Sequence, residues 1–247
     1  MKINIRTGLP FITLGAGGLS LCLQLWLFSR EDELGLLPKA HFSGSLCLIL
    51  FAVFLVFLFL VSRKFPPMSK YTSLFPADVF GALGCVAGAV GIATTLFSGF
   101  NGMIMLMIVC ILTGGAAMGA LLYTGYCRFV GEKPSYLFHS ALIVSLMLQM
   151  INACRVWGAQ PQAQLYFFPM LAHIFLLLTA YHRATLDYGK HQRQWYIFFN
   201  QAAVFCCLLA APAERPVFYL CMAAWASTNL CSLKTLRHRP TAPKEEG

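Results

Sequence analysis

Five polar residues that lie inside otherwise apolar stretches are the side chains of this chain with the greatest scope for chemistry. They are His139, His173, Asn200, Gln201 and Asn229. Imidazole and carboxamide groups donate and accept hydrogen bonds without carrying a full charge, so they suit a neutral or amphiphilic ligand. The same groups could instead join neighbouring helices, because interhelical hydrogen bonds in membranes contribute about 0.6 kcal/mol each.

Four of these residues are predicted to lie at one depth. With the helix directions derived below, His139, Asn200, Gln201 and Asn229 fall in the cytoplasmic third of a bilayer, on three helices of the C-terminal half. A pocket would leave part of their hydrogen-bonding capacity facing an enclosed space, whereas helix contacts would pair every group. Both interpretations stay open. His173 should lie about two helical turns from His139 in depth, which argues against one haem held by both.

The usual catalytic signatures are missing from the sequence. It contains no Gly-x-Ser-x-Gly, no phosphate-binding glycine loop and no His-Glu-x-x-His. Ten cysteines include no Cys-x-x-Cys pair. Asp78 is the one carboxylate close to a predicted span, where it would complement the positive N-terminal end of a helix. The sequence therefore leans against an enzyme, and we expect no cofactor.

A loop predicted after residue 181 offers another set of polar groups. Its His182, Asp187 and His191 could bind a divalent cation, but three basic residues surround them. Those residues are Arg183, Lys190 and Arg193. Their positive charge repels metal ions and favours contact with anionic lipid, so we expect no metal site.

Eight apolar stretches must position these residues, each about long enough to cross a bilayer. The chain is 58% hydrophobic and 11% charged, whereas soluble domains are about 25% charged. The sequence therefore predicts an all-α, polytopic membrane bundle. The predicted spans are 9–28, 43–61, 76–96, 103–123, 136–154, 165–181, 195–210 and 217–233. The seventh is short and carries Asn200 and Gln201 in its first turns, so whether it crosses fully stays open.

The basic residues orient these spans. The loops on one side would hold fourteen of the 18 basic residues, including the tail 234–247 as a flexible cytoplasmic segment. The other side would hold Arg30, Lys39, Arg155 and Arg215. Cytoplasmic loops carry an excess of Lys and Arg, so the pattern predicts that both termini are cytoplasmic.

Small residues in the third and fourth spans predict close helix packing. Gly81, Gly84, Gly88 and Gly91 share one face of the third span. The fourth span carries Gly115 and Gly119. Since small residues let helix backbones approach closely in lipid, we expect the two spans to form a tight antiparallel hairpin through these faces.

A single membrane domain over 1–247 is the predicted organisation. The connector lengths repeat and are compatible with four-helix halves at 1–124 and 125–247. The expected function is a transporter-like or ligand-binding protein for a small neutral or amphiphilic molecule. The alternative is a non-catalytic membrane subunit that acts through a partner protein.

The expected surroundings follow from the same features. Its partners would be the lipid bilayer, anionic lipid at the cytoplasmic loops and another membrane protein, with no nucleic acid, because the basic residues lie in short clusters between apolar runs. The expected location is the plasma membrane, or the inner membrane of a bacterium, crossed several times.

Overall fold

The computed structural model describes residues 8–29, 42–64, 77–97, 104–157, 166–187, 193–212 and 215–231. These residues form eight helices and no strands. The helices are α1 (Gly8–Phe28), α2 (Phe42–Arg63), α3 (Val79–Phe97), α4 (Ile104–Val130), α5 (Tyr136–Trp157), α6 (Phe167–Asp187), α7 (Arg193–Ala210) and α8 (Pro216–Cys231). The chain is thus all-α, as predicted, and each helix overlaps one predicted span.

Five of these helices, α1 to α5, are long and apolar enough to span a membrane. Their outer faces are rich in exposed apolar side chains such as Phe11, Val53 and Met105. Exposing so much apolar surface to water would be unfavourable, whereas the hydrocarbon interior of a lipid bilayer accommodates it. The fold is therefore that of a helical membrane bundle.

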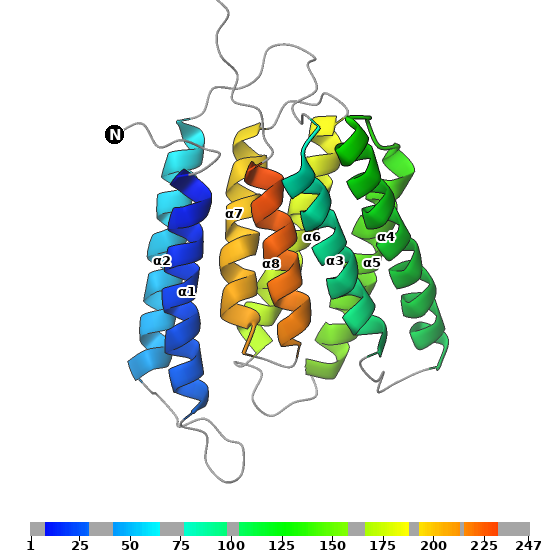
Figure 1. Cartoon of the computed structure of the whole chain (residues 1–247). Coiled ribbons are helices and arrows are strands. Elements are labelled where there is room, and N and C mark those ends of the chain that lie inside the picture. The colour runs from blue at the N-terminus through cyan, green and yellow to red at the C-terminus, as the bar shows by residue number, and fades with distance from the viewer. Residues whose placement is uncertain are drawn as a thin grey trace, which may run out of the picture.

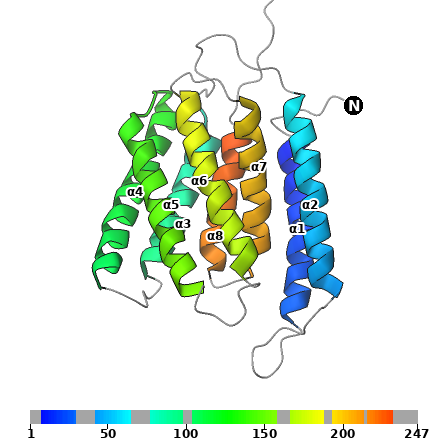
Figure 2. The same ribbon diagram turned by 180° about the vertical axis from the view of Figure 1, so that it is seen from behind.

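Helix α7 lies at the centre of the bundle. It packs against α6 and α8 on one side and against α1 and α2 on the other (Figure 1). The view from behind shows the same order, with α4 and α5 at the far side from α1 and α2 (Figure 2). Residues 200–211 are buried without interruption. The short, polar seventh stretch thus forms the innermost helix, where protein surrounds Asn200 and Gln201.

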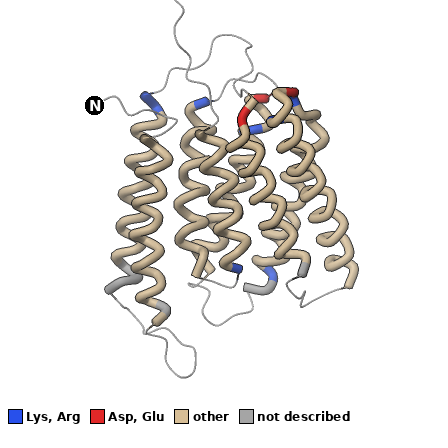
Figure 3. Tube along the Cα trace, in the orientation of Figure 1, with Lys and Arg blue, Asp and Glu red and all other residues tan. Residues whose placement is uncertain are grey.

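Charged residues of the described segments gather at the two ends of the helices (Figure 3). We call the end where α1 begins the basic end; its basic residues are Arg63, Lys64, Arg128, Lys133, Arg183 and Arg193. The opposite end carries Arg155 and Arg215. The acidic residues Glu31, Asp32 and Glu33, His191 and the tail 234–247 lie outside the described residues.

Two helices continue well past their predicted ends. Helix α4 extends to Val130 instead of residue 123, and α6 extends to Asp187 instead of residue 181. Hydropathy falls where charged residues begin, yet the helices continue because these charges are buried against neighbouring helices. Both extensions carry a buried charge beyond the predicted span: Arg128 and Arg183 are 4% and 3% exposed.

The start of α3 agrees with the sequence prediction. The Asp78 carboxylate accepts a hydrogen bond from the backbone N–H of Phe80 at 3.0 Å. An acidic cap satisfies an N–H group that the first helical turn leaves unpaired, and it complements the helix dipole. The backbone N–H of Asp78 also donates to the carbonyl of Arg128, which fastens the start of α3 to the end of α4.

The glycine face of α3 contacts α8 rather than α4. A Cβ atom at Gly84 would overlap the Thr228 side chain, and one at Gly88 or Gly91 would crowd Trp225 or Cys221. Helices α3 and α4 do pack against each other as predicted, but the prediction that Gly84, Gly88 and Gly91 form that contact was wrong. The sequence shows which face is small but not which helix fills it. Gly81 is buried and offers its carbonyl to Arg128.

Helix α4 approaches α3 through different glycines from those predicted. Gly114 meets Leu96, and Gly125 meets Ala82 and Cys85. Cβ atoms at Gly115 and Gly119 would contact nothing within 4 Å. The predicted use of Gly115 and Gly119 in this hairpin was therefore wrong, since their side of α4 faces away from its neighbours.

We predict that Gly84→Leu lowers the free energy of unfolding by about 1–3 kcal/mol, because the larger side chain must displace α8. Gly119→Leu is the matched control, since it adds the same side chain where there is open space. Thermal unfolding in a neutral detergent measures both. Equal stability of the two variants would contradict the α3–α8 contact.

Candidate functional site

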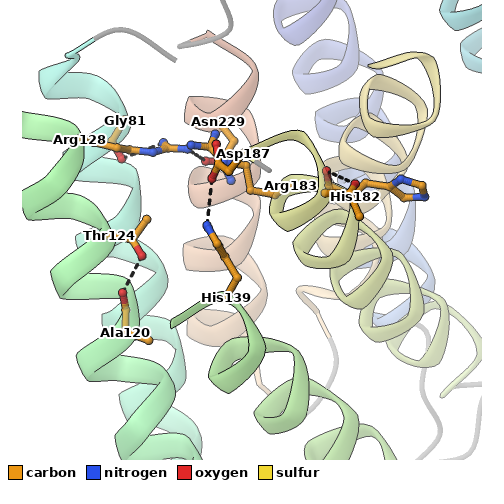
Figure 4. Close-up of polar contacts among 10 residues, drawn as sticks. Gly81, Ala120, Thr124, Arg128, His139, His182, Arg183, Asp187 and Asn229 are labelled. Atoms are coloured by element: carbon orange, nitrogen blue, oxygen red, sulfur yellow. Dashed lines mark hydrogen bonds and ion pairs between the residues drawn. The ribbon is translucent and has the colours of Figure 1, made fainter. Parts of the chain in front are cut away.

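The basic end of the bundle holds a cluster of buried polar and charged side chains (Figure 4). We call it the charged cluster. It consists of Arg128 from α4, His139 from α5, Arg183 and Asp187 from α6, Tyr196 from α7 and Asn229 from α8. Five helices therefore contribute to one site. Helices α4 to α7 each pack against the next helix in the sequence, and α8 packs against α7.

Asp187 is the acidic residue of this cluster. Its Oδ2 atom lies 2.9 Å from Nε2 of His139 and 3.1 Å from Nε of Arg183. Arg183 is one helical turn before Asp187, so helix geometry itself sets up this pair. The Arg183 guanidinium group also interacts with the buried Tyr196 hydroxyl group, which ties α6 to the central helix.

The environment keeps Asp187 ionised, and the residue lies beyond the predicted end of the sixth span. Burial by itself would raise the pKa of the carboxyl group. The charge of Arg183 and the neighbouring His139 outweigh that effect and lower the pKa to about 2. These two neighbours therefore favour the charged form of the Asp187 carboxyl group.

Arg128 lies on the other side of the cluster. Its Nη2 atom donates to Oδ1 of Asn229 at 2.6 Å, and Nη1 donates to the carbonyl of Gly81 at 3.3 Å. These contacts join the end of α4 to α8 and α3. The two oxygens are neutral acceptors, so they solvate the guanidinium group without cancelling its charge.

A small cavity lies between the two arginines. It is lined by Arg128, Arg183, His139, Asn229 and Thr124, with apolar side chains such as Leu142 and Trp225 completing its walls. About 10 Å³ is accessible to the centre of a water molecule, which is about enough for one water. The cavity therefore has both polar and apolar lining groups.

The structure brings together two of the five residues singled out from the sequence. His139 and Asn229 both line this cavity. Asn200 and Gln201 are fully buried on α7, and none of their amide atoms has a hydrogen-bond partner among the described residues. They do not line the cavity. The predicted set of four therefore divides into two cavity residues and two deeper amides on the central helix.

His173 lies apart from the charged cluster. Its Nδ1 atom is 2.9 Å from the carbonyl of Pro169, one turn earlier in α6. The ring stacks on Phe218 and meets the edge of Tyr219. His173 is thus held by aromatic rings of α8, whereas His139 contacts Asp187 at the basic end.

The sequence reasoning missed the charged members of the site. Arg183 and Asp187 were assigned to a loop that contacts lipid, but α6 carries both into the bundle, where they are 3% and 7% exposed. The signal in the sequence was their spacing of four residues, which is typical of an ion pair on one helix. His182 of the same turn stacks on Phe199 of α7, and the described residues hold no group of three metal-binding side chains.

We predict that Asn229→Ala and Asn200→Leu have different effects on stability. Asn229→Ala removes the acceptor of a buried cation and should cost about 2 kcal/mol. Asn200→Leu replaces an amide without a described partner and should leave the stability unchanged or higher. Thermal unfolding of both variants tests this. A large loss for Asn200→Leu would mean that its amide is satisfied, for example by internal water.

Comparison with protein-family models, with curated proteins and with solved structures found no match to this chain.

Proposed function

We propose that this chain is a multi-pass membrane protein that binds, and as a transporter moves, a small amphiphilic molecule at its basic end. The observation that carries the proposal is the cavity between Arg128 and Arg183, which combines polar groups with apolar walls inside a lipid-facing bundle. An amphiphile needs that combination, because its head group requires hydrogen bonds and its tail requires an apolar contact.

Buried polar groups without described partners support the same proposal. Helix α7 carries the Asn200 and Gln201 amides at its buried centre, and Thr179 of α6 is also buried with no partner for its hydroxyl group. Such groups are costly in an apolar interior unless something satisfies them. A path on which a head group or water exchanges hydrogen bonds would account for them better than helix contacts, which would pair them.

A second candidate function is that of a membrane subunit that acts through a partner. The small residues on the outer side of α4 favour it. Cβ atoms added at Gly115 and Gly119 would contact no atom within 4 Å, and Ala116 between them is exposed. Small residues on an outer face allow another helix to approach closely. If this face binds a partner, Gly119→Leu should weaken a membrane complex purified in mild detergent while the subunit itself stays stable.

The proposed topology places both ends of the chain in the cytoplasm of a cell, with the plasma membrane, or a bacterial inner membrane, as the expected location. The excess of basic residues at the end where α1 begins and α8 ends supports it. Reporter domains fused before Met1 and after Gly247 should both be active only as cytoplasmic reporters. Opposite locations of the two reporters would require an odd number of crossings.

The binding function predicts a saturable rise in unfolding temperature with a suitable amphiphile. Octanol, octanoate and octylamine, titrated against the purified protein in a neutral detergent, offer one tail with three head groups. We expect at least one to stabilise the protein and expect His139→Ala to weaken that effect about tenfold. Ser140→Ala is the matched control, since among the described residues its hydroxyl group donates to the carbonyl of Leu137 in its own helix. If no compound stabilises the protein, the proposal fails.

A further inference from the structure

We propose that the charged cluster is a receptor for an oxyanion, the carboxylate or phosphate head group of an amphiphile, which Arg128 and Arg183 bind together. This inference rests on the proposed function and names the chemical class of its ligand.

The cluster carries more positive than negative charge. It contains two guanidinium groups and one carboxylate, and His139 adds to the positive side whenever it is protonated. The other described carboxylates lie elsewhere: Asp78 caps the start of α3 and Glu132 is exposed. A buried net charge is expensive in a low-dielectric interior, so a bound anion would stabilise this end of the protein.

The end of α4 offsets part of this charge by itself. Arg128 lies in the last turn of the helix, where the macrodipole is equivalent to about half a negative charge. That explains why an arginine is tolerated at this position. It does not explain why a second arginine, from α6, lines the same cavity.

The two arginines hold their positions through different contacts. Asn229 and Gly81 fix Arg128, and Asp187 and Tyr196 fix Arg183. Their guanidinium groups are thus oriented before any ligand arrives. Planar guanidinium groups suit oxyanions because they donate two parallel hydrogen bonds, and prior orientation lowers the entropy cost of binding.

Asp187 acts as the internal competitor of such a ligand. Its carboxylate already contacts Arg183 and His139. It therefore occupies the position in which an incoming oxyanion would form its strongest ion pairs. The cavity is only about the size of a water molecule, and a ligand oxyanion would have to displace Asp187 from Arg183 to fit. The negative charge of Asp187 therefore weakens anion binding and makes it reversible.

The experiment uses the full chain in a neutral detergent and four probes. Octanoate has both acid and tail, octanol has the tail alone, and acetate and inorganic phosphate have the acid alone. We expect octanoate to raise the unfolding temperature at much lower concentration than octanol. A comparable effect of acetate or phosphate would identify a soluble anion as the source of the oxyanion, whereas an effect of octanoate alone would identify a lipid-like one.

Variants separate binding from folding. Arg128→Gln and Arg183→Gln should each weaken the octanoate effect at least about tenfold. The control is Arg155→Gln, because Arg155 is exposed at the opposite end of the bundle. Asp187→Asn should strengthen the octanoate effect, even though it removes an ion pair and lowers the stability of the unliganded protein. A purely structural cluster would not produce tighter anion binding on losing its carboxylate.

The outcomes are distinguishable. Equal effects of octanol and octanoate would overturn the oxyanion receptor while leaving the proposed amphiphile binding intact. No effect of any probe would overturn both. If Arg128→Gln does not fold, Arg183→Gln and Asp187→Asn still decide the question, and unchanged octanoate binding in Asp187→Asn would overturn the competitor role.

Discussion

A buried charge has to be satisfied by several helices at once, and this constraint organises the basic end of the bundle. Arg128 reaches α3 and α8, while Asp187 joins α5 to its own helix and Arg183 reaches α7. None of these side chains could be buried in a helix standing alone in lipid, because each ion would lose its hydration without compensation. The cluster therefore forms only when the helices assemble, and it fixes their register at that end.

Away from the cluster, close contact between small residues sets the distances between helices. The glycine face of α3 lets α8 approach until Thr228, Trp225 and Cys221 lie against the backbone. Lipid gives no hydrophobic drive for helix association, so such contacts and the polar cluster must provide the stability. The α3–α8 contact also places Asn229 next to Arg128, which links the packing of the bundle directly to the geometry of the site.

The central helix explains why polar residues occur in an otherwise apolar chain. Helix α7 is surrounded by α1, α2, α6 and α8, so its amides face protein rather than hydrocarbon. Asn200 and Gln201 on a lipid-facing helix would raise the free energy of the folded protein, whereas an interior helix keeps them away from hydrocarbon. The proposed binding function uses this difference between an inner polar helix and outer apolar ones.

The sequence by itself determined the number and approximate extent of the helices, since long apolar stretches permit few structures in a membrane. It also identified His139 and Asn229, because polar residues in such stretches stand out. It did not identify Arg128, Arg183 and Asp187 as one site, since hydropathy treats a charged residue near a helix end as the beginning of a loop.

Only the tertiary structure decided which faces meet. A glycine face indicates that another helix packs closely against it. Helices α4 and α8 both pack against α3, and the local sequence does not show which of them contacts the glycines. The same holds for charge. Hydropathy alone assigns an arginine to a loop, because the partners that allow its burial come from helices distant in the sequence. Helix formation depends on neighbouring residues, whereas the pairing of helices depends on contacts between residues far apart, such as Arg128 and Asn229, and these exist only in the assembled bundle.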